Sequence, residues 1–357
     1  MTRLGKTLLI ACLGFFALAG QQPALAAEKK AFRFAWSIYA GFMPWVYAEQ
    51  SGILRKWADK YGVEITLTQF NDYIESINQY TAGEFDGVLA TNMDALSIPA
   101  AGGVDTSMLI MGDYSNGNDA LVVKGQGKTL ADLKGLPVSL VELSVSHYLL
   151  SRALAKAGLS EAEVRTVNIS DADYIPAWNA KETVAMAAWK PGLSVIEAQP
   201  DASVVFNSAQ IPGEIMDVAV VNTETLRENP AFGKALVGAW YETLALMQGD
   251  SAEAKSARSL MAEASGTDLA GYDTQLATTH LFVTPGEAAA FMRDPAIRTH
   301  MELVRDFCFD HGLLGEGAKN KEAIGIALPD GTVLGDPQNV KLRFAPEITT
   351  LAADGKL

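Results

Sequence analysis

Cysteine is scarce in this 357-residue chain, which contains only Cys12 and Cys308. Cys12 lies in an N-terminal stretch that is expected to be removed, so the mature chain has no cysteine pair for an internal disulfide or a thiolate zinc site. In "RDFCFDHG", Cys308 is predicted to pack as a small apolar residue. Stability must therefore come from packing of the core, for which a chain of this length is ample.

Basic residues are also few, because 28 lysines and arginines stand against 42 aspartates and glutamates, a formal net charge of −14. Removal of residues 1–26, which contain two basic and no acidic residues, leaves 26 − 42 = −16. A chain this acidic is repelled by phosphate backbones. We therefore exclude nucleic acid as a partner.

Long apolar runs are missing except near the N-terminus. Arg3 and Lys6 precede an apolar run at 8–19 that is too short to span a bilayer, and "ALA" at 24–26 is a small-x-small cleavage pattern. Residues 1–26 are therefore predicted to be a cleavable signal peptide that exports the protein to the periplasm. The faint lipoprotein-like box "LIAC" is the lesser alternative, since few residues precede it.

Motifs of catalysis and metal binding are not found. "GQGK" at 125–128 lacks the spacing of a P-loop, and "SVSH" at 144–147 lacks the elbow of a serine hydrolase. His280, His300 and His311 have no partner at metal-ligand spacing. We predict a protein that is not an enzyme, with no catalytic residue, no metal and no cofactor.

What the chain does contain is a regular alternation of strand-like and helical segments. One set of apolar strand patterns lies at 32–38, 64–70, 86–92 and 106–112; a second lies at 136–142, 164–170, 183–189 and 202–208. Strands that alternate with helices predict parallel sheets covered by helices. Two such sets predict two α/β lobes, and a further strand at 216–222 indicates that the chain returns to the first lobe.

The stretch "FAWSIYAGFMPWVYAEQSGIL" at 34–54 begins as a strand, breaks at Gly41 and resumes as a helix near Pro44. A strand followed at once by a helix points the first free N–H groups of the helix beyond the carboxyl end of the strand, where open α/β sheets bind their ligands. Residues 37–45 are therefore predicted to form a binding loop.

Several blocks of the chain, taken in order, resemble those of a known family. They are "FAWSIYAGFMPWVYAEQSGIL", "YIESINQYTAGEFDGVLATNMDAL", "ALVVKGQGKTLADLKGLPVSLVELSVSHYLLSRALAKAGL" and "VAVVNTETL". They resemble a periplasmic substrate-binding protein of an ABC importer, of the nitrate/taurine/sulfonate type, over about residues 32–245. Within that group the chain is most similar to the branch that accompanies urea carboxylase, an enzyme type linked also to guanidine breakdown.

The resemblance implies the two-lobe periplasmic-binding-protein fold of type II, an α/β fold with the ligand cleft between the lobes. It implies capture of a small-molecule ligand by lobe closure and docking on an ABC permease in the inner membrane. We assign residues 27–120 plus 221–357 to lobe 1 and residues 121–220 to lobe 2. The hinge crossings are expected near 119–124 and 214–220, in a monomeric protein.

Carboxylates follow nearly every strand of the two predicted sheets, at Asp72, Asp94, Asp119, Glu142 and Asp171. They would repel an anion, whereas a planar cation such as guanidinium would donate two hydrogen bonds to one carboxylate and stack on an aromatic ring. Neutral urea would use the same acceptors. The competing explanation is that the aspartates and serines at these positions only cap helices.

Side chains near the predicted strand ends form the expected cleft wall. The predicted ligand-binding residues are Trp36, Tyr39, Asp72, Asn92, Asp94, Glu142, Ser144, His147, Trp189 and Asp217.

The function predicted from these features is capture of a small nitrogen-rich solute, guanidinium or urea, for an ABC importer. The alternatives are a binder of a sulfonate, nitrate or pyrimidine ligand, an exported sensor that docks on a receptor, and an enzyme similar to thiamine-pyrimidine synthases. Those enzymes use a cysteine-rich motif with histidine and iron, which a chain with one mature cysteine does not provide.

Overall fold

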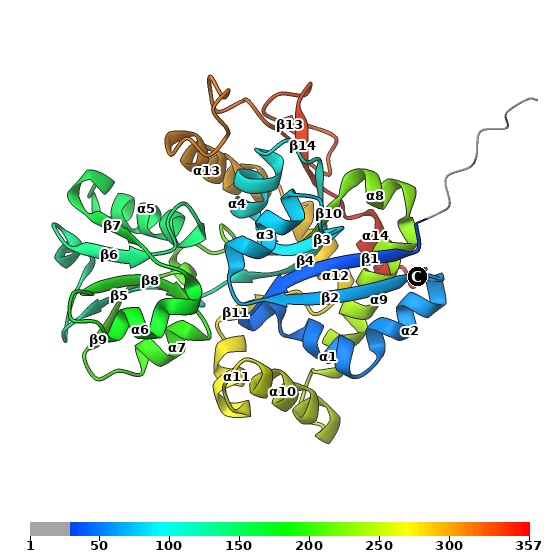
Figure 1. The fold of residues 1–357 in the computed structure, drawn as a ribbon, viewed down its shortest axis with the longest axis horizontal. Coiled ribbons are helices and arrows are strands. Elements are labelled where there is room, and N and C mark those ends of the chain that lie inside the picture. The colour runs from blue at the N-terminus through cyan, green and yellow to red at the C-terminus, as the bar shows by residue number, and fades with distance from the viewer. Residues whose placement is uncertain (1–28) are drawn as a thin grey trace, which may run out of the picture.

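A computed structural model describes residues 29–357, which form two lobes, each built on its own sheet (Figure 1). The predicted signal peptide at 1–26 lies outside the described residues. Within residues 29–357, no helix is long and apolar enough to cross a membrane.

The larger sheet has the strand order β13-β12-β14-β4-β10-β3-β1-β2, with β11 paired to β4 off this path. Strands β1, β2 and β3 are parallel, whereas β10 is antiparallel to both β3 and β4. The sheet is therefore mixed, which differs from the predicted parallel sheet because β10 enters from the opposite end after the excursion into the small lobe. Its strands are β1 Ala31–Ser37, β2 Glu64–Phe70, β3 Gly87–Thr91, β4 Thr106–Ser115, β10 Met216–Asn222, β11 Thr279–Leu281, β12 Gly325–Ala327, β13 Val333–Leu334 and β14 Val340–Phe344.

Helices cover both faces of this sheet, as Figure 1 shows. The first of them follows the predicted break: a 3₁₀ turn, η1, at Ala40–Phe42 leads into α1 at Pro44–Gln50, with proline in the first turn. The other helices of the large lobe are α2 Ile53–Tyr61, α3 Tyr73–Thr81, α4 Asn92–Ala95, the π-helical η2 Leu96–Ala100, α8 Thr223–Glu228, α9 Pro230–Leu246, α10 Ala252–Ala264, α11 Leu269–Leu276, α12 Pro285–Met292, α13 Ala296–Asp310 and α14 Glu347–Ala353.

The small lobe is built on a sheet with the order β7-β6-β8-β5-β9. Its strands β6, β7 and β8 are parallel, and β5 is antiparallel to both β8 and β9. Its elements are β5 Asp119–Lys124, η3 Leu130–Leu133, β6 Pro137–Leu140, α5 Val145–Ala157, η4 Glu161–Glu163, β7 Arg165–Asn168, η5 Asp171–Asp173, α6 Tyr174–Asn179, β8 Ala185–Trp189, α7 Gly192–Glu197, β9 Ala202–Asn207 and η6 Ser208–Gln210.

Two short segments, 116–118 and 208–215, connect the two sheets. They are held together by Ser208, whose Oγ lies 2.7 Å from Oγ of Ser115 and accepts a hydrogen bond of 2.7 Å from the N–H of Gly117. The predicted lobe boundary at 220 is wrong by several residues, because the whole of β10 pairs with strands of the larger sheet. The predicted crossing at 119–124 is likewise strand β5 of the smaller sheet.

Strand β4 is longer than the sequence predicts. The sequence predicts a strand at 106–112, yet β4 continues to Ser115 and buries Asp113 completely. The partner strand explains the difference, since Asp113 pairs across the ladder with Asp217 of β10, another buried carboxyl. A single sequence gives no sign of that pairing.

Candidate functional site

A small cavity with a volume of about 20 Å³ lies where the two lobes meet. The carboxyl ends of the strands and the first turns of the following helices provide its walls, as expected for α/β sheets. The large lobe contributes Ser37, Tyr39, Phe42, Tyr73, Thr91 and Asp217; the small lobe contributes Asp119, Val145 and Trp189; and Ile215 belongs to a crossing segment.

Two buried carboxyls face the cavity, one from each lobe. Asp119 begins β5 and Asp217 lies near the start of β10, and both are about 3% exposed. Burial raises the pKa of Asp119 to about 7, against which a hydrogen bond from Ser115 acts. Burial, together with the charges of Asp113 and Asp119, raises the pKa of Asp217 well above its ordinary value. The site thus holds carboxyl groups that resist ionisation while nothing positive is bound.

Asp113 forms a second layer behind the cavity wall. Tyr39, a cavity-lining residue, donates a hydrogen bond of 3.2 Å from its hydroxyl to Oδ1 of Asp113. Burial raises the pKa of Asp113 to about 7, although hydrogen bonding to Asp217 and Tyr39 opposes the shift. The Oδ2 atoms of Asp113 and Asp217 receive no hydrogen bond from any other group. A proton held between these two facing carboxyls satisfies both atoms.

Within the described part of the chain, residues 29–357, the buried carboxyls have no cationic partner. Lys190 is the basic residue whose charge lowers the pKa of Asp119, yet its Nζ pairs with Glu197 at 3.6 Å and donates to Thr278 at 3.1 Å. Among residues 29–357, no lysine or arginine makes an ion pair with Asp113, Asp119 or Asp217. Buried charges are ordinarily paired or neutralised by a proton, so these carboxyls are candidates for contact with a ligand.

Gly41, at the break between strand and helix, allows the close approach of Asp113. A Cβ atom added at Gly41 would overlap Oδ2 of Asp113 and the ring of Tyr39. Gly41 is fully buried, so neither neighbour has open space into which to move. The glycine that sequence reasoning placed in a binding loop is thus required by the carboxyl layer behind the cavity.

We expect Gly41→Ala to lower the free energy of unfolding by about 2 kcal/mol, because the added methyl group overpacks the buried contact with Asp113. Urea unfolding of the purified protein measures this. The matched control is Gly317→Ala, since Gly317 is exposed and has open space around it. Equal stability of the two variants would contradict the close packing at Gly41.

Aromatic rings form much of the remaining wall. The rings of Tyr73 and Trp189 meet edge to face across the lobes with centroids 5.5 Å apart, and Tyr174 lies behind Trp189 at 5.2 Å. On the other side Tyr39 and Phe42 meet at 4.9 Å. Aromatic faces attract cations, and a flat cation gains most from lying against them.

A carboxyl of the chain lies near the helix N-terminus at the cavity. Val145 begins α5, and its backbone N–H acts to lower the pKa of Asp94. Oδ2 of Asp94 accepts hydrogen bonds from the hydroxyls of Tyr73 at 2.8 Å and Thr91 at 2.9 Å, whereas its Oδ1 has no hydrogen-bond partner among residues 29–357. Burial raises the pKa of Asp94 to about 6 in spite of these bonds. The carboxyl of Asp94 therefore lies near the first turn of α5, where the N–H groups of a helix favour negative charge.

Three of the predicted ligand-binding residues, Tyr39, Trp189 and Asp217, line the cavity. Asp94 lies one layer behind it, bonded to the cavity-lining Tyr73 and Thr91. Trp36 is buried in β1 on the face opposite Ser37, and Ser37 is the one that reaches the cavity. The alternation of side chains along the strand therefore turns Trp36 into the core.

The other predicted residues have structural partners away from the cavity. Asn92 donates to the carbonyl of Glu214 at 3.1 Å and accepts from the N–H of Met216 at 3.0 Å, which ties α4 to a crossing segment. Ser144 caps α5 by accepting from the N–H of Ser146. Asn92 and Ser144 thus have structural partners and do not line the cavity, and their contact with a ligand stays a prediction.

Asp72 and Glu142 also lie outside the cavity. Asp72 caps α3 through the N–H of Glu75 and accepts a hydrogen bond of 2.8 Å from Ser170 of the small lobe. Glu142 is partly exposed and accepts a hydrogen bond from Thr166. Capping, the competing explanation, accounts for Asp72, whereas Glu142 is held by its neighbour on β7.

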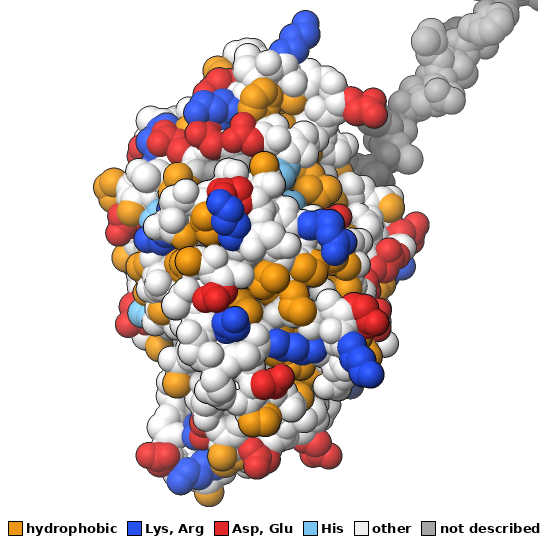
Figure 2. All heavy atoms as spheres, turned by 90° about the vertical axis from the view of Figure 1, so that its left-hand side faces the viewer, with side chains coloured by type: hydrophobic (Ala, Val, Ile, Leu, Met, Phe, Trp, Pro, Cys, Tyr) orange, Lys and Arg blue, Asp and Glu red, His pale blue; other side chains and the backbone are white. Residues whose placement is uncertain are grey.

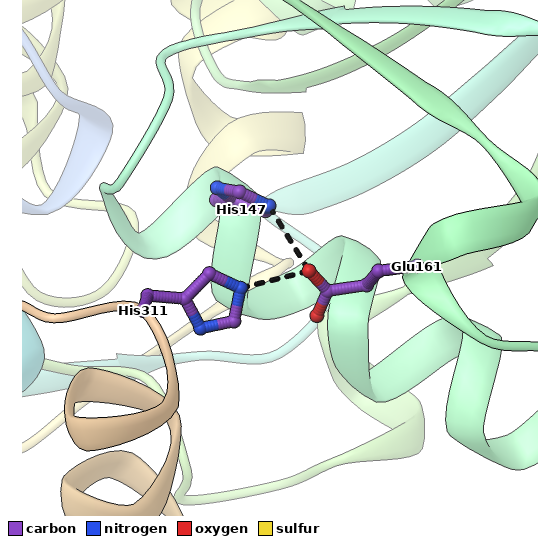
Figure 3. Close-up of side chains that lie close together, drawn as sticks. All are labelled: His147, Glu161 and His311. Carbon is purple, nitrogen blue, oxygen red and sulfur yellow. Dashed lines mark hydrogen bonds and ion pairs between the residues drawn. The ribbon is translucent and has the colours of Figure 1, made fainter.

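Direct contacts between the lobes close the cleft. The N–H of Tyr73 donates to Oδ1 of Asp171 at 3.2 Å, beside the Asp72–Ser170 bond. His147 of the small lobe lies against His311 of the large lobe, with Glu161 between them (Figure 3). The sequence did not predict this cluster, since 164 positions separate the two histidines and only the fold brings them together.

Seven cavity-lining residues were absent from the predicted set of ligand contacts: Ser37, Phe42, Tyr73, Thr91, Asp119, Val145 and Ile215. Asp119 was predicted as a strand-end carboxylate but not as a ligand contact. Unlike the other predicted strand-end carboxylates, it is the first residue of the small lobe's sheet and lines the cavity. The carboxyls of Asp113, Asp119 and Asp217 are buried inside the protein. On the surface, Figure 2 shows acidic, basic and apolar side chains interspersed over the face on the small-lobe side.

Comparison with known proteins gives one family and one fold. The model of the NMT1-like family matches residues 11–262. A taurine-binding periplasmic protein of Escherichia coli (strain K12) is 24% identical over 191 residues, which are 51% of this chain and 58% of that protein. The chain thus spans little more than half the length of this curated relative.

Solved structures align over more of the chain. The alkanesulfonate-binding protein SsuA from Xanthomonas axonopodis pv. citri, bound to MOPS, matches with a TM-score of 0.64 and 20% identity, covering 82% of this chain and 96% of that one. The periplasmic nitrate-binding protein NrtA from Synechocystis PCC 6803 matches with a TM-score of 0.57 and 12% identity, covering 92% and 99%. The predicted periplasmic-binding-protein fold is confirmed.

Proposed function

Since this chain belongs to the NMT1-like family, we propose that it is the periplasmic solute-binding component of an ABC importer and that its ligand is a small cation, guanidinium first. The cavity at the lobe junction supports this proposal, because Asp119 and Asp217 face it without any basic partner. That single observation distinguishes the site from one built for the sulfonates and nitrate named for the similar proteins.

A planar ligand with N–H donors on more than one edge suits this geometry. One edge of guanidinium donates two hydrogen bonds to the carboxylate of Asp119, and another reaches Asp217, so that the ligand joins the lobes. The rings of Tyr73 and Trp189 bound the remaining space. An ammonium ion carries the same charge but lacks the flat shape that aromatic walls favour.

Urea is the second candidate, and the protonation of Asp217 favours it. Burial and the charges of Asp113 and Asp119 raise the pKa of Asp217, and a protonated Asp217 would donate to the oxygen of urea while Asp119 accepts from its N–H groups. Both ligands agree with the proposed place of this chain in the branch that accompanies urea carboxylase.

Lobe closure supplies the mechanism of capture. A ligand touches Asp119 of one lobe and Asp217 of the other only when the lobes are closed, so it shifts the population toward the closed form by its differential affinity. No bond is made or broken. The closed, monomeric protein then delivers its ligand to the membrane permease.

A thermal-shift screen with calorimetry tests the proposal. Guanidinium chloride at about 100 times its dissociation constant should add roughly 2.7 kcal/mol of stability, a rise of several degrees in Tm. Urea, taurine, nitrate and a pyrimidine are compared at equal concentration, and sodium chloride controls for ionic strength. Stabilisation by an anion and not by guanidinium or urea would refute the proposed ligand class.

A further inference from the structure

A cluster of two histidines and one glutamate joins the lobes at a distance from the cavity wall (Figure 3). His147 lies in the first turn of α5 and Glu161 in η4, both in the small lobe, whereas His311 follows α13 of the large lobe. Nε2 of His311 lies 2.7 Å from Oε2 of Glu161, and Nε2 of His147 lies 3.4 Å from the same oxygen. Glu161 is thus one of the points at which the two lobes meet.

Both ring nitrogens of His311 face oxygen acceptors. Its Nδ1 lies 2.9 Å from the carbonyl oxygen of Phe307, and its Nε2 lies 2.7 Å from the carboxylate of Glu161. A neutral imidazole carries one N–H and donates only once, so the two contacts together require the imidazolium form. A neutral ring with its proton on Nε2 keeps only the hydrogen bond to Glu161, so the contact between the lobes is strongest, and is an ion pair, when His311 is protonated.

His147 has the opposite arrangement. Its Nδ1 accepts a hydrogen bond of 3.2 Å from the backbone N–H of Leu143, which leaves the proton on Nε2, toward Glu161. A metal ion at Nε2 would need the proton on Nδ1, where the Leu143 N–H already points. The geometry of His147 is thus arranged for donation to Glu161.

We infer that His311, Glu161 and His147 form a proton-dependent latch that holds α13 of the large lobe against α5 and η4 of the small lobe and thereby sets the stability of the closed form. This inference builds on the lobe closure of the proposed function, but not on the identity of the ligand. His311 acts as a positioning residue, since it does not line the cavity.

The surroundings of the latch support a direction for its pH dependence. Burial opposes ionisation of Glu161, but hydrogen bonds from His147, Ser151 and His311 outweigh it and lower the pKa of Glu161 to about 2. Glu161 therefore stays charged throughout the neutral range. The aromatic ring of Phe307 stacks on His311 at 4.0 Å, and the adjacent Asp310 is exposed. Closure is thus favoured when His311 is protonated and weakened as pH rises.

Spin labels on the two lobes measure the closed fraction without any ligand. Exposed Val195 of α7 and Leu246 of α9 are changed to cysteine and labelled, and buried Cys308 is left unreacted. Distances are recorded by pulsed electron spin resonance from pH 5.5 to pH 8, with EDTA present. The closed-to-open ratio is expected to fall as pH rises over this range. We expect the fall in the parent protein to be roughly five times the fall in His311→Gln or Glu161→Gln.

His280→Gln is the matched control, because His280 is an exposed histidine that stacks on Tyr114 far along the chain from the latch. It should respond to pH as the parent does. Comparison of variants also removes the contribution of the cavity carboxyls, which titrate in the same range in every variant. An unchanged pH response in His311→Gln would overturn the inference. Closure by micromolar Zn²⁺ that EDTA reverses would also overturn it, in favour of a metal site.

Discussion

Asp119→Asn is expected to weaken guanidinium binding roughly a hundredfold and, at the same time, to raise the thermal stability of the ligand-free protein. The loss follows because Asp119 is the small lobe's carboxylate in the cavity, and an amide offers the cation one acceptor and a repelling NH₂ group. The gain follows because burial without a cation disfavours the charged form of Asp119, whose pKa is raised to about 7. Calorimetry at pH 8 and thermal unfolding measure the two effects.

Glu142→Gln is the control for this variant. Glu142 was among the predicted ligand contacts, but it is partly exposed, bonds to Thr166 and lies outside the cavity lining. Its substitution should leave the affinity for guanidinium unchanged. If Asp119→Asn bound guanidinium as well as the parent does, or if Glu142→Gln bound it much more weakly, the assignment of the cavity as the ligand site would be wrong.

The affinity for guanidinium is expected to rise roughly thirtyfold between pH 5.5 and pH 8, because binding of the cation displaces the proton of a carboxyl whose pKa is about 7. Below that pKa each unit of pH costs about a factor of ten, and above it the affinity levels off. The latch at His311 acts in the opposite sense but more weakly, so His311→Gln should steepen the rise.

The same carboxyls make the stability of the ligand-free protein fall as pH rises. Asp113 and Asp119 hold protons up to about pH 7 in the folded chain, whereas in the unfolded chain they release them near pH 4. The folded state binds more protons over this interval, so its stability decreases from about pH 4 to pH 7. Tm measured across this range, with and without guanidinium, checks the sign. Constant affinity and constant Tm would show that these groups are already charged in the free protein.

Much of the fold could be predicted from sequence periodicity, because the strand and helix patterns are strong. The strand at 64–70 has the predicted bounds, and Gly41 and Pro44 mark the break before α1 as expected. The antiparallel β10 and the extension of β4 could not be predicted, since both depend on the pairing of Asp113 with Asp217. Periodicity describes one strand at a time and says nothing of its neighbour.

The site could be predicted only in part. Reading residues off strand ends gave Tyr39, Trp189 and Asp217, which line the cavity. It also gave Asp72 and Ser144, since a residue that follows a strand and begins a helix is equally suited to capping. Whether such a carboxyl caps or faces a ligand depends on its burial and on the groups that donate to it, and these are tertiary properties.

Hydroxyl groups at the two crossing segments contact Asp119, the proposed ligand-binding carboxyl of the small lobe. Ser115 bonds to both the carboxyl and the backbone N–H of Asp119, and Ser208 joins Ser115 to the second crossing. A change in the charge of Asp119 therefore acts directly on Ser115 and Ser208, which join the two crossing segments. Under the proposed function, ligand contact at Asp119 and rotation of the lobes involve the same hydrogen-bond network.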